Sequence, residues 1–403
     1  MSENLFVGID LSSQTYAAHF MDDSGNSLRQ SLVFNNDIVG LHKLINTIEK
    51  LHTTHLFKSI HIGMEATGFY WWHLRQALDD KHFDAIDLKL YVINPSLSKG
   101  FKKAYTKLPK TDHIDAWIIA DRIRFGRLKP ITEKDLCYQP LARLTRFRFQ
   151  MKKQIHAEKN RACNLVFLKF SSYAQAAGKR FFNKASLDLL NDFTLDEIAE
   201  KPVEELVEFF LEHGNKRFAN PKLYAEEIKA AARRSYRLND KMQDTVGVAL
   251  AMSCQNLRFF ESQCKKLDRV IAKELKAIPQ TLTTITGVGP TLTAGIIAEI
   301  GDINRFNNEK GLAKFAGLTW NRHQSGSFEA EETSLTKAGN TYLRYYLVEA
   351  ANCLRLHNAD YRAFYQRKFD EVPKHQHKRA LVLTARKFVR LVFAMLSKGQ
   401  IYR

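Results

Sequence analysis

The chain of 403 residues has little of what marks secreted, membrane-spanning or low-complexity proteins. Its glycines number 19 and its prolines 9, so low-complexity linkers do not dominate it. No run approaches the ~20 consecutive apolar residues that cross a bilayer. The first residues also lack the basic start and the apolar stretch of a secretory signal. We therefore expect a cytoplasmic protein that does not enter a membrane.

Cysteine is scarce, and its spacing argues against two common uses of this residue. The five cysteines are widely scattered, and no two of them form a Cys-x-x-Cys pair. A disulfide scaffold and a zinc ribbon are therefore both disfavoured, as in a protein of a reducing compartment. The cysteines are Cys137, Cys163, Cys254, Cys264 and Cys353.

The remaining composition is that of a globular protein. Hydrophobic residues make up 45% of the chain and charged residues 26%, which excludes a largely disordered chain. At ~100–200 residues per domain, the length allows two or three domains with a sizeable core.

Positive charge is in clear excess and is unevenly placed. Lys and Arg total 61 against 43 Asp and Glu, a net charge of +18. Residues 95–161 hold 17 basic and 6 acidic side chains, and residues 376–403 hold 7 basic and none acidic. A single charged run is usually a solvated helix face, but two such regions with interleaved aromatic residues favour a nucleic-acid partner. Residues 183–213 are acidic instead, with 9 carboxylates and 2 lysines, and their role is left open.

The first 140 residues alternate between strand and helix signals. Three expected strands come first, the first of them an apolar run with a polar end, and Asp23-Ser24-Gly25-Asn26 predicts a hairpin turn after the second. Strand–helix units follow, so that we expect an α/β domain with a mixed sheet in the order of the ribonuclease H-like fold. The expected strands are 5–12, 15–23, 27–34, 59–66 and 89–95, and the expected helices are 37–51, 70–81 and 111–126.

The middle of the chain, residues 141–278, reads as almost entirely helical. One helix is expected over 141–170, and a second over about 224–277 with only Gly247 as an interruption. Apolar residues in the second helix recur at steps of three and four, which is typical of a coiled-coil seam. The seam can pair within the chain or between subunits, and we slightly favour pairing with the first helix. Its residues are Leu257, Phe260, Cys264, Leu267, Ile271, Leu275 and Ile278.

The last part, residues 279–403, reads as mostly helical and begins near a glycine-rich turn. Gly287-Val288-Gly289-Pro290 lies between two helical patterns, as in a helix-hairpin-helix. The exposed backbone N–H groups of Gly287 and Gly289 would then contact DNA phosphates. An ordinary corner between two helices has the same sequence signature.

Four carboxylates occupy positions that can converge. Asp10 and Glu65 each end an expected strand, and Asp112 and Asp115 lie three residues apart at the start of an expected helix, on one face. Carboxylates at close quarters remain ionised together only beside cations, and oxygen ligands select Mg²⁺ or Mn²⁺. Singly, each has a plainer explanation as a turn residue, an ion-pair partner of a lysine or a favourable charge at a helix start. Jointly they predict a metal site that acts on phosphodiesters.

These carboxylates lie in sequence blocks that resemble one known family. The N-terminal blocks look like the DEDD motif of transposases of the Insertion Sequence 110 family, and blocks in the last third follow that family's second domain in order. The resemblance brackets nearly the whole chain, whereas residues 170–275 are similar only in being helical. The N-terminal blocks are Gly8-Ile9-Asp10, Glu65-Ala66-Thr67-Gly68 and Lys110-Thr111-Asp112-His113-Ile114-Asp115-Ala116. The C-terminal blocks are Ile285-Thr286-Gly287-Val288-Gly289-Pro290, Ala298-Glu299-Ile300-Gly301-Asp302, Phe315-Ala316-Gly317-Leu318, Gln324-Ser325-Gly326, Lys337-Ala338-Gly339-Asn340 and Leu343-Arg344.

The resemblance implies a fold and a site that the residues alone do not. It implies a RuvC-like domain over 1–140, a helical coiled-coil region over 141–278 and a C-terminal transposase domain over 279–403. It also implies that Ser325 attacks DNA to form a covalent phosphoserine, beside metal ions held by Asp10, Glu65, Asp112 and Asp115. Without the resemblance, Ser325 reads as a plain Ser-Gly turn, and a serine needs a base or a metal to become nucleophilic.

The same resemblance implies the partners. They are donor and target DNA, a structured guide RNA that pairs with both, and further copies of the chain in a dimer or tetramer, in a bacterial-type, nucleoid-associated setting. Guided enzymes leave sequence reading to base pairing. Basic residues expected to contact nucleic acid are Lys102, Lys103, Lys110, Lys337 and Arg344, the last two also reading as surface ion-pair residues.

Two other function classes fit parts of the sequence. A hydrolytic RuvC-like nuclease or junction resolvase would use the four carboxylates and water, with Ser325 dispensable. A non-catalytic nucleic-acid scaffold would use the carboxylates only as helix caps and would show no metal dependence.

Overall fold

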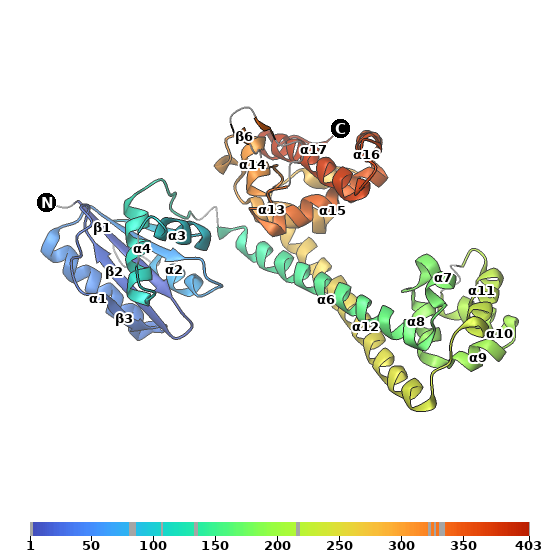
Figure 1. Ribbon diagram of the computed structural model, residues 1–403. Coiled ribbons are helices and arrows are strands. Elements are labelled where there is room, and N and C mark those ends of the chain that lie inside the picture. Colours follow the sequence, from blue (N-terminus) through green and yellow to red (C-terminus); the bar gives the residue numbers. More distant parts are fainter. Residues whose placement is uncertain are drawn as a thin grey trace. The chain divides into compact units, whose positions relative to one another are not determined.

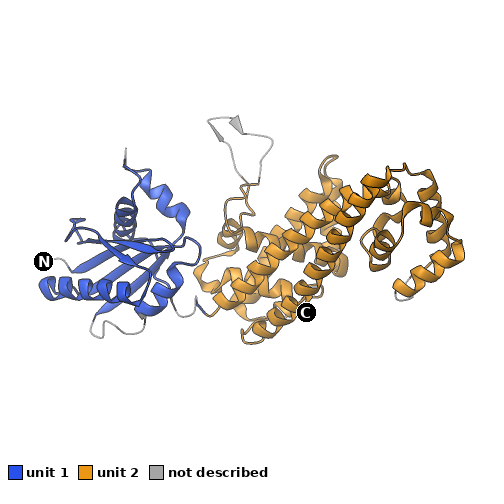
Figure 2. Cartoon of the chain, turned by 90° about the horizontal axis from the view of Figure 1, so that it is seen from below, with its two compact units in different colours: residues 1–136 blue, residues 137–403 orange. Residues whose placement is uncertain are grey.

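The structure, a computed structural model, describes residues 3–79, 86–105, 108–132, 136–214, 218–320, 324–325, 328–329 and 335–402. The chain divides into two units, residues 1–136 and 137–403, which are coloured separately in Figure 2. Each unit is described by itself. In the parts of the chain that the structure describes, no helix is both long enough and apolar enough to cross a membrane.

A mixed five-stranded sheet is the framework of the first unit (Figure 1). Its order is β3-β2-β1-β4-β5, with antiparallel β1–β2 and β2–β3 pairs and parallel β1–β4 and β4–β5 pairs. The mixed sheet predicted from the sequence is confirmed, and its order is compatible with a RuvC-like domain. The strands are β1 (Asn4–Leu11), β2 (Thr15–Met21), β3 (Leu32–Asn35), β4 (Ser59–Glu65) and β5 (Asp87–Ile93).

The third strand is shorter than the predicted 27–34. Only Ser27 makes an isolated bridge to Met21 before the pairing of β3 resumes at Leu32. In between, the His19 ring lies within hydrogen-bonding distance of the Ser27 and Ser31 hydroxyls, at 3.1 and 3.3 Å. These side-chain contacts replace the backbone ladder over this stretch.

Four helices flank the sheet, and their starts follow from capping side chains. Asp37 caps α1 by accepting a hydrogen bond from the Gly40 amide at 2.7 Å, and Thr111 caps α4 through the Ile114 amide at 3.3 Å. Helix α3 was not predicted from the sequence, where Pro95 indicates only the end of a strand. The proline also occupies the first turn of α3, behind an Asn94 cap. The helices are α1 (Ile38–His55), α2 (Trp71–Asp79), α3 (Pro95–Lys102) and α4 (Asp112–Arg124).

The two faces of the sheet are covered by different helices. One face of β1, which includes Leu5, Val7 and Ile9, packs in a cluster with residues of α1 and α2. On the other face of β1, Phe6 packs in a second cluster with Ile119 and other residues of α4. Because side chains alternate along a strand, Gly8 and Asp10 lie on the α4 face with Phe6.

Two glycines let α4 lie directly on the sheet. Gly8 and Gly63 are register partners on β1 and β4. A Cβ atom at Gly8 would lie 2.1 Å from the Ala116 carbonyl oxygen, and one at Gly63 would lie 2.9 Å from a methyl group of Ile123. The absence of side chains at these two positions therefore sets how closely the helix approaches the strands.

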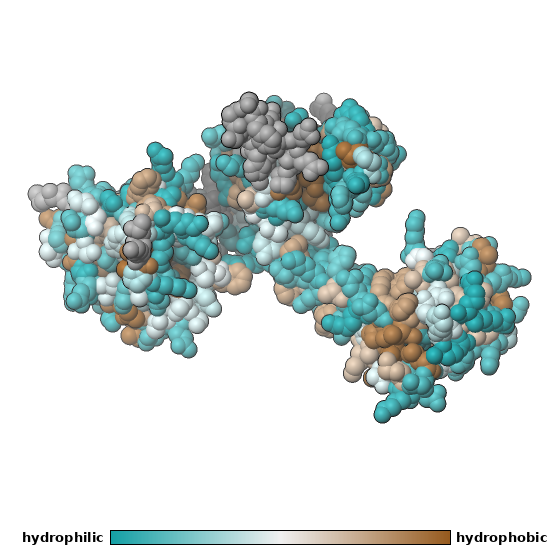
Figure 3. Space-filling model, viewed as in Figure 1, coloured by the Kyte–Doolittle hydropathy of each residue, from teal (hydrophilic) through white to brown (hydrophobic). Residues whose placement is uncertain are grey.

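Two long helices and a helical lobe make up much of the second unit. Helices α6 (Gln139–Lys169) and α12 (Asp240–Leu275) pack along one another within the chain, as Figure 1 also shows. Between them the chain forms a lobe of short helices, on which apolar residues gather near α8 in the view of Figure 3. The lobe contains α7 (Tyr173–Ala177), a 3₁₀ turn (Gly178–Arg180), α8 (Lys184–Asp192), α9 (Leu195–Glu200), α10 (Val203–His213) and α11 (Pro221–Arg234).

The prediction of one helix over about 224–277 is wrong. Helix α11 ends at Arg234, and α12 begins at Asp240. Ser235 accepts a hydrogen bond from the Ser172 amide at 3.1 Å, and Asn239 caps α12 through the Met242 amide at 2.9 Å. Short polar side chains that bond the backbone thus end one helix and start the next.

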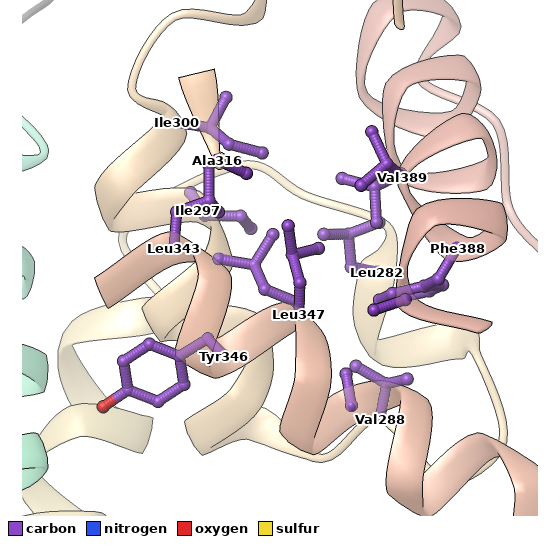
Figure 4. Packing of buried hydrophobic residues seen from close by; sticks show 14 of the residues in the cluster. Leu282, Val288, Ile297, Ile300, Ala316, Leu343, Tyr346, Leu347, Phe388 and Val389 are labelled. Carbon is purple, nitrogen blue, oxygen red and sulfur yellow. The ribbon is translucent and has the colours of Figure 1, made fainter. Parts of the chain in front are cut away.

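A second hydrophobic core organises the C-terminal helices (Figure 4). Leu343, Tyr346 and Leu347 of α15 are fully buried at its centre, against α13 and α17. The elements here are 3₁₀ turns at Leu282–Thr284 and Ile303–Arg305, α13 (Pro290–Ile300), α14 (Glu309–Phe315), β6 (Gln324–Ser325), β7 (Phe328–Glu329), α15 (Thr341–His357), α16 (Ala359–Asp370) and α17 (Gln376–Lys398).

We expect Gly8→Ala to destabilise the first unit by at least about 2 kcal/mol, since the new methyl group meets rigid backbone of α4. Gly100→Ala is the matched control. Gly100 lies in α3, and no atom lies within 4 Å of the place that a methyl group would take there, so alanine should be neutral or stabilising by up to about 1 kcal/mol. Denaturant unfolding of both variants checks this, and equal stabilities would show that the close approach is not limiting.

Candidate functional site

Asp10 and Glu65 lie at the carboxyl ends of adjacent parallel strands. The pairing of Ile9 with Met64 places the two acids side by side at one edge of the sheet. Each acid comes two residues after one of the paired glycines, Gly8 and Gly63, so both lie on the face that α4 covers. The Thr67 hydroxyl donates a hydrogen bond of 3.3 Å to Glu65 Oε1.

The first turn of α4 brings two more carboxylates to this edge. Asp112 precedes Ala116 by one turn, and the backbone of Ala116 is what meets Gly8. The helix stripe that packs on the glycine therefore continues into Asp112. Asp115 lies in the same first turn, where its carboxylate forms an ion pair with Lys102 of α3.

The electrostatics show that the four acids act on one another. Burial and, after it, the negative charges of Asp115, Asp112 and Glu65 together raise the pKa of Asp10 from 3.8 to about 6, against a smaller lowering by the hydrogen bond from the Leu11 amide. Like charges that disfavour ionisation are expected where carboxylates share a site. The structure thus brings together the four predicted acids as one electrostatic group.

The donor set of this group suits a divalent metal, although the site is not closed. Four carboxylates offer the hard oxygen ligands that Mg²⁺ and Mn²⁺ prefer. Within the described part of the chain, however, no three His, Cys, Asp or Glu side chains are close enough to hold an ion. The ammonium of Lys102 neutralises Asp115 instead. The four carboxylates would have to move closer together to hold a cation.

The basic residues predicted to contact nucleic acid fall into two groups. Lys103, Lys110 and Lys337 are exposed. Lys102 is engaged by Asp115, and Arg344 has a structural role, because its Nη1 donates to the carbonyl oxygens of Ala316 at 3.1 Å and Lys337 at 2.9 Å. Burial lowers the pKa of the Arg344 guanidinium.

The glycine turn differs from the expected hairpin between two helices. Gly287 has a φ of +92°, and Gly289 is the residue that precedes α13, but a 3₁₀ turn at Leu282–Thr284 precedes them. Val288 between them is buried, and its amide donates to the Ile285 carbonyl at 2.9 Å. The Val288 amide is therefore used within the chain.

The backbone of Ser325 lies in β6, opposite Phe328 of β7, and its side chain lies outside what the structure describes. The segment that carries Ser325 runs from Trp320 to Leu335, and backbone contacts hold its two ends together. Trp320 and Leu335 form an antiparallel bridge, and the Thr336 amide donates to the Thr319 carbonyl at 2.9 Å.

A buried ion pair that the sequence analysis did not identify supports the two ends of this segment. Glu299 of α13 is 4% exposed and receives Arg146 Nε at 2.6 Å and Nη2 at 2.8 Å, and the Asn340 amide group at 2.6 Å. Asn340 also caps α15 through the Leu343 amide. The network joins α6, α13 and the start of α15. Glu299 and Asn340 belong to the sequence blocks quoted above, but nothing in the sequence indicates a role for either. Their role is seen only from the residues that they contact in the folded chain.

The raised pKa of Asp10 makes a pH-dependent stability prediction. The folded state binds this proton more tightly than the unfolded state, so the ionised carboxylate costs stability as the pH rises from about 4 to about 6, and the cost is complete above that. Without divalent ions, Asp10→Asn should therefore raise the free energy of unfolding at pH 8, by about 1–2 kcal/mol after solvent screening. The gain should vanish near pH 4.

Thermal unfolding across this pH range, with and without Mg²⁺, measures the effect. At pH 8, added Mg²⁺ should raise the unfolding temperature of the native protein more than it raises that of Asp10→Asn. A gain that is the same at pH 4 and pH 8 would contradict the shared electrostatic site.

Comparison with known proteins gives two family matches. The DEDD transposase model of the IS110 group matches residues 7–170, and the model described as "Transposase IS116/IS110/IS902 family" matches residues 279–366. Residues 171–278, which include the helical lobe, lie outside both matches.

Curated relatives agree with these family matches. The transposase for insertion sequence element IS1111A of Coxiella burnetii is 30% identical over 32% of this chain, a match that spans only 38% of that protein. The pilin gene-inverting protein of Moraxella bovis is 22% identical over 84% of this chain and 79% of its own length. An uncharacterized 43.6 kDa protein of insertion element IS110 from Streptomyces coelicolor is 26% identical over 73% of this chain and 72% of its own length.

Proposed function

Because the chain belongs to the Insertion Sequence 110 family of transposases, we propose that it cuts and rejoins DNA strands through a covalent phosphoserine at Ser325. The observation that carries the proposal is the raised pKa of Asp10, which is due first to burial and then to the nearby charges of Asp115, Asp112 and Glu65. A relative named as a gene-inverting protein supports rejoining as well as cutting, because inversion requires both.

The proposed chemistry is a pair of phosphoryl transfers. The Ser325 oxygen forms a bond to phosphorus, the bond to one sugar oxygen breaks, the serine proton leaves to a base, and the departing sugar oxygen takes up a proton. Attack by another sugar hydroxyl then reverses these bond changes on a new strand and frees the serine. Because the phosphodiester energy is kept in the serine ester, the strands rejoin without ATP.

The chain's own residues have separate roles in this scheme. Asp10, Glu65, Asp112 and Asp115 would hold a divalent cation, Mg²⁺ or Mn²⁺, which when bound supplies charge stabilisation to the phosphate oxygens. The Trp320–Leu335 bridge and the Glu299 network fix the two ends of the segment that carries Ser325.

The proposed partners follow from the family and from charge. Donor and target DNA are the substrates, and a structured guide RNA selects the sites. The net charge of +18 supports polyanionic partners. Recombination holds several DNA ends at once, which supports a homo-oligomer, a dimer or a tetramer.

The competing function is a hydrolytic nuclease that uses the same carboxylates and water. It is favoured by the fact that the acidic site lies wholly within residues 1–136, whereas Ser325 belongs to the other unit. The two functions differ in whether protein becomes covalently joined to DNA.

We expect the native protein with Mg²⁺, guide RNA and target DNA to form a denaturation-resistant protein–DNA adduct, because the serine ester survives unfolding. Ser325→Ala should abolish it, whereas Ser327→Ala, two residues along the same segment, should retain it. Denaturing gel electrophoresis with labelled DNA makes the measurement. An undiminished adduct from Ser325→Ala would rule out this nucleophile, and cleavage without any adduct would favour the nuclease.

Mixing two inactive variants tests whether the site is shared between chains. In a trans arrangement, an oligomer of Asp10→Ala and Ser325→Ala chains contains one acidic site and one serine that are both intact. Adduct should then reappear on the Asp10→Ala chain, which mass spectrometry identifies. Mixed oligomers that stay inactive would place both parts of the site in one chain.

A further inference from the structure

A basic hollow lies between the helical lobe and α12. It has a volume of about 470 Å³ and lies between the start of α8 and the second half of α12. The volume is in the range of ligand-binding clefts. Its cationic lining residues are Lys184, Arg258, Lys265, Lys266 and Arg269.

The cations form a regular row on α12. Arg258, Lys265 and Arg269 are spaced by seven and four residues, so they share one helix face, and all three are exposed. At 1.5 Å per residue, neighbours in the row are ~11 and ~6 Å apart along the helix axis. A second hollow, which shares Lys184 and adds Arg180, extends the cationic surface across the lobe. A row of this length suits a chain of phosphates better than one small anion.

Few carboxylates offset this charge. Glu261 is the lining acid, and it lies 3.2 Å from the ammonium of Lys159. Arg258 pairs with the buried Asp188. Over the described residues, no carboxylate forms an ion pair with Lys265, Lys266 or Arg269. These three cations are therefore available to an outside anion.

The hollow is also lined by an aromatic ring and by polar groups that can form hydrogen bonds with a ribose. Phe182 lines it, half-buried, with the Lys159 ammonium 5.3 Å from its ring centre. Aromatic rings in a basic groove stack unpaired bases. Glu261 and Ser262 lie among the cations on α12. A carboxylate repels phosphate but accepts a hydrogen bond from a 2′-hydroxyl, the group that distinguishes RNA from DNA.

We propose that this surface, Phe182 with the three available cations Lys265, Lys266 and Arg269, binds a single-stranded segment of a folded RNA. The cations contact successive phosphates, Phe182 stacks a base, and Glu261 and Ser262 contact ribose hydroxyls. The lobe lies outside both family matches, so this contact is an addition to the matched domains. That this RNA is the guide rests on the proposed function, whereas the binding of RNA to this surface does not.

The test compares two triple variants of the full chain. Lys265→Ala/Lys266→Ala/Arg269→Ala removes three charges from the hollow. The matched control, Lys222→Ala/Arg234→Ala/Lys241→Ala, removes three exposed charges from α11 and the start of α12. The probes are fluorescent oligouridylate and oligodeoxyuridylate of about 16 nucleotides, measured by anisotropy over a range of salt.

The hollow variant should bind the RNA probe about 10-fold or more weakly, and its log–log salt slope should fall by about 0.7 for each lost phosphate contact. The control should change much less. Equal losses in both variants would overturn the proposal, because they would show only a general charge effect. Equal loss of RNA and DNA binding in the hollow variant would overturn the choice of RNA.

Two further variants separate stacking and sugar contacts from charge. Phe182→Leu keeps an apolar side chain and should weaken RNA binding and abolish ultraviolet cross-linking to Phe182. Glu261→Ala should strengthen DNA binding and narrow the preference for RNA. Cross-links that map only outside 180–187 and 258–269 would overturn the site. None of these measurements uses strand exchange, so a failure of the serine mechanism would leave them unaffected.

Discussion

The acidic site depends on the direct contact between α4 and two paired glycines of the sheet. Gly8 and Gly63 have no side chain to hold the helix away, and a methyl group at Gly8 would lie 2.1 Å from the Ala116 carbonyl. Two residues beyond each glycine stands an acid, Asp10 or Glu65, on the same face. One turn before Ala116 stands Asp112. The close packing of α4 on Gly8 and Gly63 thus also places the carboxylates of the helix near those of the strands.

In the second unit, polar contacts fix the two ends of the segment that carries Ser325. A buried carboxylate is costly unless it is fully paired. Glu299 is paired on both oxygens, by the Arg146 fork and by the Asn340 amide, and it connects three helices through these bonds. Arg344 adds bonds to two carbonyl groups that border the segment. Polar groups inside the core therefore define where the segment of Ser325 starts and ends.

Local patterns could be predicted from the sequence where one element determines them. The apolar runs of β1 and β4, each ending in an acid, and the cap before α4 are local patterns, and the expected positions of the four acids follow from them. The prediction of one long helix over 224–277 was wrong because the bonds of Ser235 and Asn239 to backbone end one helix and start the next. The role of Glu299 could not be predicted, because Arg146 lies 153 positions earlier in the chain. Ser325 was singled out only by family resemblance, since its own surroundings carry no chemical signal.

The central claim is that carboxylates from two strands and one helix bind one divalent cation. Iron(II), which replaces Mg²⁺ at oxygen-ligand sites, reduces added hydrogen peroxide to hydroxyl radicals, with ascorbate regenerating the iron(II), and these radicals cut the backbone next to where the iron is bound. Mass spectrometry of the fragments should show cuts near Asp10, near Glu65 and near Asp112–Asp115, all suppressed together by excess Mg²⁺ and all lost in Asp10→Asn. Cuts at only one of these three places, or cuts that Asp10→Asn leaves unchanged, would contradict a shared site.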